Sequence, residues 1–290
     1  MTFRINAPAK VNLSLCITGR RDDGYHTLVT RMQKLDLCDL LELDLTDRND
    51  IEISCDSIEI PADRTNLAVK AALKFFDRFN KSSGSGLRIS LKKNIPVAAG
   101  LGGGSSDAAA VLKGLNEMLG EPLSEDELFD VGRQLGADVP FFISDHAAVI
   151  ATGIGDKLEK IASVDNYHFI LVNPGFSVNT KWVYENYRLT KKNKKFKLCG
   201  SQNNVVEPFT VNELYNDLEQ VTGSHYPVIG QIKDSLLEEG AAGALMSGSG
   251  PTVFGMFTNR ETALAACSRL KKVYNKQDLR VISAHTLDGA

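Results

Sequence analysis

The sequence predicts an α+β protein with two lobes, and three observations lead to this class. The chain has 290 residues, which is long for one domain and comfortable for two. Segments with the period-two alternation of strands alternate loosely with segments of helical periodicity, without an internal repeat. The middle of the chain then turns polar and lysine-rich, and we place the domain boundary just before it. We therefore expect domains at residues 1–158 and 159–290.

Composition and charge narrow the class of protein. Hydrophobic residues make up 43% of the chain, enough to bury a core. The formal net charge is −3 with acids and bases mixed, which does not fit a nucleic-acid-binding protein. The five cysteines are widely spaced without a CxxC pair, which argues against a disulfide framework and a thiolate zinc site. The sequence shows no apolar segment typical of the core of a signal peptide and none long enough to span a membrane. We therefore expect a reduced, cytoplasmic protein without a membrane partner.

Early in the chain, the pattern predicts two strands and a helix. Residues 10–17 alternate between polar and apolar side chains, which is typical of a strand with one buried face. The polar face presents Lys10 and Asn12 together. Residues 66–80 carry one apolar stripe at four-residue spacing, which predicts a helix; the stripe is Leu67, Ala71, Phe75 and Phe79. Alternation at residues 87–91 predicts a second strand, which leads into a glycine-rich segment.

The later elements follow from the same patterns. Residues 108–119 are predicted to form a helix, and the capping-box spacing of Ser124 and Glu127 predicts another, which runs to about residue 135. The basic run Lys191–Lys197 is expected to be a solvated loop. The alternative is that its positive charge weakly attracts an anionic ligand. The remaining predictions are strands at 169–172, 252–257 and 281–286 and helices at 229–240 and 262–274.

Residues 96–106, which we call the glycine loop, predict a phosphate-binding site. Their sequence is Pro-Val-Ala-Ala-Gly-Leu-Gly-Gly-Gly-Ser-Ser. Glycines before a helix let the backbone approach an anion closely and adopt positive φ, while the free N–H groups of the helix N-terminus attract phosphate. The expected binding residues are Pro96, Val97, Ala98, Ala99, Gly100, Leu101, Gly102, Gly103, Gly104, Ser105 and Ser106. Ser105 and Ser106 can donate hydroxyl hydrogen bonds or ligate a magnesium ion.

Three common phosphate motifs do not fit the glycine loop. A Walker A loop needs a lysine after its glycines, and none follows here. Ser105 stands where a dinucleotide fingerprint has its third glycine. The chain also lacks the His-Arg-Asp and Asp-Phe-Gly signatures of protein kinases. The alternative of a flexible linker is disfavoured because a strand precedes the loop and a good helix follows.

Two further motifs accompany the glycine loop. Pro8-Ala9-Lys10-Val11-Asn12-Leu13 stands near the start, and residues 245–254, Leu-Met-Ser-Gly-Ser-Gly-Pro-Thr-Val-Phe, stand near the end. In this order and spread over most of the chain, the three motifs resemble those of the GHMP kinase superfamily. The resemblance implies a two-lobed fold, with an N-terminal ATP-binding α/β domain similar to a ribosomal-protein-like domain and a ferredoxin-like C-terminal α/β domain. It also implies ATP as phosphoryl donor, with Mg²⁺ arriving on the nucleotide.

Two more segments narrow the resemblance. Residues 19–26, Gly-Arg-Arg-Asp-Asp-Gly-Tyr-His, and residues 135–142, Leu-Gly-Ala-Asp-Val-Pro-Phe-Phe, are similar to the branch that phosphorylates the 2-hydroxyl of a cytidyl-capped methylerythritol in the non-mevalonate isoprenoid pathway. The alternatives are another GHMP small-molecule kinase, such as a mevalonate-type kinase, and a non-catalytic nucleotide-binding paralogue. The presence of both Lys10 and Asp138 speaks against each.

The resemblance assigns the catalytic roles to two charged residues. It makes Asp138 the carboxylate that accepts the proton of the attacking hydroxyl or orients that hydroxyl. It makes Lys10 the charge partner of Asp138 and of the transferring phosphoryl group.

The acceptor site is likewise assigned by resemblance. Tyr25 is expected to stack on the cytosine ring and His26 to hydrogen-bond its edge, while Asn12 contacts the erythritol or its diphosphate. Tyr184 is our candidate for the second stacking ring, in a position where the branch has Phe. The other histidines have no ligand-like spacing, so we expect no metal site built by the protein alone.

Overall fold

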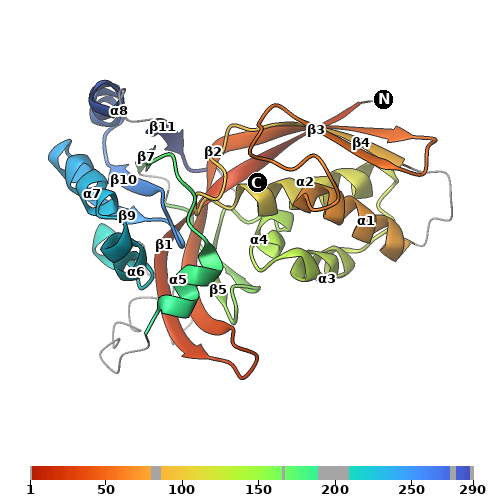
Figure 1. Cartoon of the computed structure of the whole chain (residues 1–290), viewed down its shortest axis with the longest axis horizontal. Helices are drawn as coiled ribbons and strands as arrows, with labels where there is room; N and C mark the ends of the chain where they lie inside the picture. Colours follow the sequence, from red (N-terminus) through yellow and green to blue (C-terminus); the bar gives the residue numbers. More distant parts are fainter. Residues whose placement is uncertain (1, 80–85, 165–166, 189–208, 275–278, 288–290) are drawn as a thin grey trace. The chain divides into compact units, whose positions relative to one another are not determined.

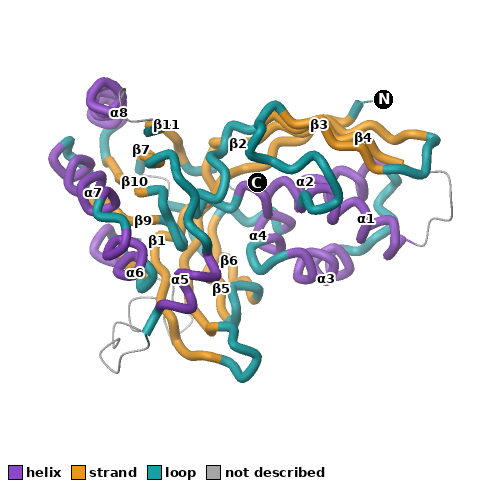
Figure 2. Tube along the Cα trace, in the orientation of Figure 1, coloured by secondary structure: helices purple, strands orange, loops and turns teal. Residues whose placement is uncertain are grey.

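The computed structural model describes residues 2–79, 86–164, 167–188, 209–274 and 279–287 (Figures 1 and 2). The chain forms two compact units, each made of separate segments. Unit 1 comprises Met1–Ala9, Leu37–Val97 and Gly102–Asp145, and unit 2 comprises Lys10–Asp36, Ala98–Leu101 and His146–Ala290. The last crossing between the units therefore lies between residues 145 and 146. The domain boundary between residues 158 and 159 stays a prediction.

Unit 1 combines the edge of a sheet with helices. Strand β4 (Gly86–Lys92) pairs antiparallel with the end of β2 (His26–Thr46) and parallel with β3 (Ile51–Cys55). Four helices lie on one face of these strands (Figure 1): α1 (Leu67–Phe79), α2 (Gly103–Met118), α3 (Glu125–Leu135) and α4 (Val139–Ile143). Helix α2 approaches the strands closely, because a Cβ on Gly114 would lie 2.5 Å from the Leu43 side chain.

Local signals explain where these helices begin. Asn66 caps α1 by accepting the Ala68 N–H at 2.9 Å, and in the apolar stripe predicted for this helix Ala71 and Phe75 are buried. The predicted capping box at Ser124 is confirmed. The Ser124 hydroxyl accepts the Glu127 backbone N–H, and the Glu127 side chain accepts the Ser124 backbone N–H. Helix α2 begins five residues before the predicted position 108, because Gly102, with φ of 75°, serves as its N-cap.

Unit 2 contains the four-stranded antiparallel sheet β11-β7-β10-β9. Its strands are β7 (His168–Asn173), β9 (Gly243–Met246), β10 (Val253–Phe257) and β11 (Arg280–His285). In chain order this is a 4-1-3-2 arrangement with a helical connection after the first strand and another after the third, which is the ferredoxin-like topology expected for the C-terminal part. Helices α7 (Val228–Glu238) and α8 (Arg260–Tyr274) lie on the same side of this sheet in Figure 1.

Unit 2 also holds the second part of β1 and the first part of β2. β1 (Phe3–Arg20) pairs parallel with β8 (Tyr215–Asn216), and β2 pairs antiparallel with β5 (Ala148–Thr152). One buried apolar cluster joins Leu15 and Ile17 of β1 to the strands and helices of the ferredoxin-like part. The remaining elements are β6 (Lys157–Lys160), α5 (Thr180–Asn186) and α6 (Glu219–His225).

Strand β2 has no counterpart among the predicted elements. Its 21 residues bury polar side chains that interrupt the simple alternation; these are Thr30, Arg31, Gln33, Lys34 and Asp39. Thr30, Arg31, Gln33 and Asp39 have side-chain partners in distant parts of the chain, which a local pattern cannot anticipate. The short strands β3, β5, β6 and β9 were also missed.

Three cysteines in the described part of the chain, Cys38, Cys55 and Cys267, are free thiols. The reduced state of the whole chain stays a prediction. In the described part of the chain, no helix has the length and apolar character needed to cross a bilayer. The basic run Lys191–Lys197 lies outside the described residues.

Candidate functional site

The polar face of β1 forms a buried hydrogen-bonded row in unit 2. Lys10 and Asn12 are only 4% and 3% exposed. The Lys10 ammonium donates to Asn12 Oδ1 at 2.6 Å, and the Lys10 backbone N–H donates to the Leu101 carbonyl at 2.9 Å. The two side chains that the sequence placed on one strand face are therefore in direct contact, next to the glycine loop.

Residues 247–250, which we call the glycine turn, close over this row. A Cβ on Gly248, with φ of +55°, would lie 3.3 Å from Asn12 Oδ1 and 3.6 Å from Lys10 Nζ. Ser247 Oγ accepts the Asn12 backbone N–H at 3.3 Å and donates to the Gly100 carbonyl at 2.8 Å. Within unit 2, parts of all three motifs recognised in the sequence thus meet.

In unit 1, the second half of the glycine loop forms the N-terminus of α2. The first intrahelical bond runs from the Ser106 N–H to the Gly102 carbonyl at 2.9 Å, so the preceding N–H groups have no intrahelical acceptor. The first turn carries no acidic residue, and a Cβ on Gly104 would meet no atom within 4 Å. Ser106 Oγ is buried without a hydrogen-bond partner in the described structure. This N-terminus therefore fits a phosphate group, and the Ser106 hydroxyl fits a cation that prefers oxygen ligands.

Three buried charges, Asp39, Lys93 and Asp107, form an ion cluster that holds both ends of the glycine loop. The Lys93 ammonium bonds to Asp39 Oδ2 and, at 2.8 Å, to Asp107 Oδ2 in α2. Asp39 Oδ1 accepts the backbone N–H groups of Asn94 at 2.7 Å and Ile95 at 2.9 Å, just before the loop. One ammonium therefore links the strand side of the loop to its helix side, and all its partners belong to unit 1.

The ion cluster carries more negative than positive charge. Burial raises the pKa of the Asp107 carboxyl to about 7, although the Lys93 ammonium lowers it. The other oxygen of this carboxyl, Oδ1, has no hydrogen-bond partner in the described structure. Asp107 was not recognised as notable in the sequence, because nothing local distinguishes it from an ordinary solvated aspartate.

Asp138 lies between α3 and α4, also within unit 1. It is half-buried and precedes α4, whose first turn contains Pro140. Two residues earlier, a Cβ on Gly136 would lie 3.9 Å from Ser105 Oγ. The loop that carries Asp138 therefore borders the glycine loop. Lys10 belongs to unit 2, and its pairing with Asp138 stays a prediction.

An aromatic cluster in unit 2 contains two of the residues predicted to bind cytosine. The rings of His26 and Tyr184 have centroids 5.5 Å apart, and Tyr187 approaches His26 edge-on at 6.1 Å. Burial, with a smaller contribution from the charge of Arg20, lowers the pKa of His26. Tyr25 is 63% exposed and so has a free ring face for a ligand. Sequence reasoning missed Tyr187, which follows directly after α5 as its C-cap residue.

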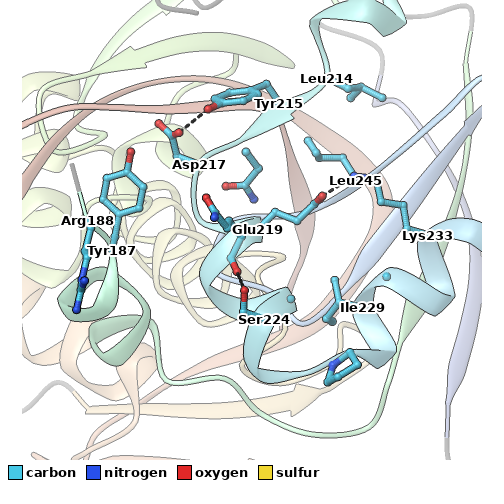
Figure 3. Close-up of a pocket in the computed structure, with 15 residues that line it drawn as sticks. Tyr187, Arg188, Leu214, Tyr215, Asp217, Glu219, Ser224, Ile229, Lys233 and Leu245 are labelled. Atoms are coloured by element: carbon cyan, nitrogen blue, oxygen red, sulfur yellow. Dashed lines mark hydrogen bonds and ion pairs between the residues drawn. The ribbon is translucent and has the colours of Figure 1, made fainter. Parts of the chain in front are cut away.

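A pocket of about 540 Å³ lies in unit 2 between β8, α6 and α7, and Tyr187 of the aromatic cluster is one of the residues that line it. Figure 3 shows Tyr187 and Asp217 on one side of it and Lys233 on the other. Tyr215 donates to Asp217 at 2.6 Å, and Lys233 pairs with Glu219. None of the predicted site residues lines this pocket. Within the described ranges, no three His, Cys, Asp or Glu side chains are arranged to hold a metal ion.

Comparison with known proteins gives a consistent result. Residues 66–146 match the family model of the GHMP kinases N terminal domain, and residues 205–276 match that of GHMP kinases C terminal. The 4-diphosphocytidyl-2-C-methyl-D-erythritol kinase of Syntrophotalea carbinolica is 51% identical over 264 residues, which cover 91% of this chain and 92% of the relative. That of Desulfotalea psychrophila is 46% identical, with 95% of each chain covered.

The fold agrees with the sequence comparison. A crystal structure of a 4-(cytidine 5'-diphospho)-2C-methyl-D-erythritol kinase superposes with a TM-score of 0.77 and 31% identity, covering 98% of this chain and 99% of the other.

Replacing Asp107 by Asn should stabilise the protein increasingly as the pH rises. Because the pKa of Asp107 is raised from 3.8 to about 7, the folded state holds a proton that the unfolded state releases, and wild-type stability falls as the pH rises through this window. In this window the wild-type unfolding free energy falls by up to about 1.4 kcal/mol per pH unit, whereas that of Asp107→Asn lacks this dependence. The stability of Asp107→Asn relative to wild type should therefore rise by about 2 kcal/mol between about pH 5.5 and pH 8.

Urea unfolding of both proteins at the two pH values measures this difference. Asp130→Asn serves as the control, because that carboxyl is 68% exposed. An equal stability difference between Asp107→Asn and wild type at both pH values would contradict the buried, proton-binding state of Asp107.

Proposed function

Because the chain belongs to the 4-diphosphocytidyl-2-C-methyl-D-erythritol kinases, within the GHMP kinases, we propose that it transfers the γ-phosphoryl group of ATP to the 2-hydroxyl of 4-diphosphocytidyl-2-C-methyl-D-erythritol. The reaction belongs to the non-mevalonate isoprenoid pathway, and we place it in the cytoplasm. The observation that carries the proposal is the 51% identity to a kinase of that name over nine-tenths of the chain. It favours this activity over a mevalonate-type kinase or a non-catalytic paralogue.

The phosphates of ATP are proposed to bind at the glycine loop. The free N–H groups at the start of α2 and the open space above Gly104 support this assignment. Mg²⁺ is proposed to be held by the ATP phosphates and by Ser106 Oγ, the buried hydroxyl without a partner. When bound, the ion neutralises phosphate charge during the transfer.

Asp138 and Lys10 are proposed to act on the transferred group and its acceptor. The Asp138 carboxylate accepts the proton of the attacking hydroxyl, or orients that hydroxyl for attack. The Lys10 ammonium, held by Asn12 at 2.6 Å, offsets the negative charge that develops in the transition state. Because phosphoryl transfer depends mainly on position and charge, both groups must be held in place before the substrate arrives.

The aromatic cluster is proposed to bind the cytidine group. Because the pKa of His26 is lowered, its imidazole is neutral at pH 7 and can both donate and accept hydrogen bonds along the cytosine edge. Tyr25 supplies one stacking face and Tyr184 the other, with Tyr187 packed against His26. Asn12 is proposed to contact the erythritol or its diphosphate.

Replacing Asp138 by Asn or Lys10 by Ala should each lower kcat by about 100-fold or more, because a proton acceptor or a charge partner of the reaction is removed. Steady-state kinetics with ATP and the cytidyl substrate measure this loss, and circular dichroism checks the fold. Asp145→Asn and Lys113→Ala are matched controls, since these residues form an ion pair with side chains 79% and 37% exposed. Near-wild-type turnover in Asp138→Asn or Lys10→Ala would remove that residue from the catalytic assignment.

Replacing Tyr184 by Ala should raise KM for the cytidyl substrate by about 10-fold, because stacking contributes about 1–3 kcal/mol per base. KM for ATP should stay unchanged. Tyr184→Phe keeps the ring and should behave like wild type, which separates stacking from the hydroxyl group. A substrate KM that does not respond to Tyr184→Ala rules this ring out of the cytidine site.

A further inference from the structure

The Lys10–Asn12 contact continues through a third side chain, Thr30 of β2. Asn12 Nδ2 donates to Thr30 Oγ1 at 2.8 Å, and Thr30 Oγ1 donates to the Ser14 carbonyl at 2.6 Å. Thr30 is 3% exposed, so its hydroxyl has little access to water as a substitute partner. The row of bonds thus runs from the Lys10 ammonium through Asn12 and Thr30 back to the backbone of β1.

Donor and acceptor chemistry sets the direction of every bond in this row. A lysine ammonium only donates, so Asn12 must turn its carbonyl oxygen towards Lys10. Its amide nitrogen then faces Thr30 and needs an acceptor. The Thr30 hydroxyl can accept there because its own proton is engaged with the Ser14 carbonyl. The hydroxyl of Thr30 therefore selects the orientation of the Asn12 amide that suits the ammonium.

The same arrangement restricts where the ammonium can go. A lysine side chain has many rotamers, and holding it in one position costs side-chain entropy. The backbone of Gly248 lies over Asn12 Oδ1 and Lys10 Nζ, and even a methyl group there would be in tight contact with Asn12 Oδ1. With one side closed by the glycine turn, the fixed oxygen on Asn12 contributes to the position of the ammonium.

We propose that Thr30 is a positioning residue for the phosphoryl transfer, and that it acts on the Lys10 ammonium through the Asn12 amide. This inference rests on the proposed function, because it assumes that the Lys10 charge acts in the reaction. Without the hydroxyl, the Asn12 amide nitrogen is left in a buried site without this acceptor, and the amide shifts towards another one. The Asn12 carbonyl oxygen moves with it, and the Lys10 ammonium that bonds to this oxygen leaves its position.

Replacing Thr30 by Val removes the hydroxyl and keeps the shape of the side chain. We expect kcat to fall by about 10- to 100-fold, because displacing a catalytic group by about 1 Å can cost about 100-fold, while KM for ATP stays within about twofold. Thr30→Ser restores the hydroxyl and should recover most of kcat. Thr27→Val is the matched control on the same strand, because the Thr27 hydroxyl bonds to Thr18 at an exposed position.

A double-mutant cycle with Lys10→Ala separates positioning of the ammonium from a general structural role. If Thr30 acts only through Lys10, Thr30→Val should cause no further loss of kcat in the Lys10→Ala background. An equal loss in both backgrounds overturns the proposal, as does a Thr30→Val enzyme with wild-type kcat. If Lys10→Ala itself keeps wild-type kcat, the proposed function of Lys10 fails instead, and the two failures are thereby distinguished.

A second variant keeps the test open if Thr30→Val is too unstable to assay. Thr30→Cys retains a weak acceptor in place of the hydroxyl and should give a kcat between those of wild type and Thr30→Val. Full activity in Thr30→Cys with a normal melting temperature contradicts the proposal, because a thiol holds the Asn12 amide only weakly.

Discussion

In unit 2, two backbone segments approach each other so closely that only glycine can stand between them. A Cβ on Gly100 would lie 2.2 Å from the Ser247 carbonyl oxygen, and both Gly100 and Gly248 adopt positive φ. This contact brings the glycine turn onto the polar face of β1 and lets Ser247 bond to both Asn12 and the glycine loop. The glycines of the two motifs are therefore needed for close packing of backbone, and the positions of Lys10 and Asn12 depend on it.

The two units hold their charged groups in different ways. In unit 1, the ion cluster buries a lysine with two aspartates and thereby fixes both ends of the glycine loop. Burying an excess carboxylate is unfavourable, as the raised pKa of Asp107 indicates, so the cluster is better explained by positioning than by stability. In unit 2, the Lys10 ammonium bonds to the Asn12 amide, which in turn bonds to Thr30. The direction of these hydrogen bonds contributes to the position of the ammonium.

Much of the fold and part of the site could be predicted from the sequence, and the rest depends on contacts between distant residues. The capping box at Ser124 and the apolar stripe of α1 are local signals, and both predictions are confirmed. Strand β2 was missed because its buried polar side chains find partners far along the chain. Asp107 and Thr30 look ordinary in sequence for the same reason, since only folding buries them beside Lys93 and Asn12. Tyr187 was missed because no helix was predicted before it, and only folding brings its ring to His26.

The measurement that tests the central claim most directly is a coupled ADP-release assay with ATP, magnesium and 4-diphosphocytidyl-2-C-methyl-D-erythritol, run beside mevalonate, galactose and homoserine. The account predicts turnover with the cytidyl compound alone, because the His26 and Tyr184 rings supply a site for a base that the other alcohols lack. Turnover with one of the other alcohols instead would contradict the cytidine assignment while leaving the phosphate site intact. A folded protein that binds ATP but turns over none of the four would contradict the kinase function itself.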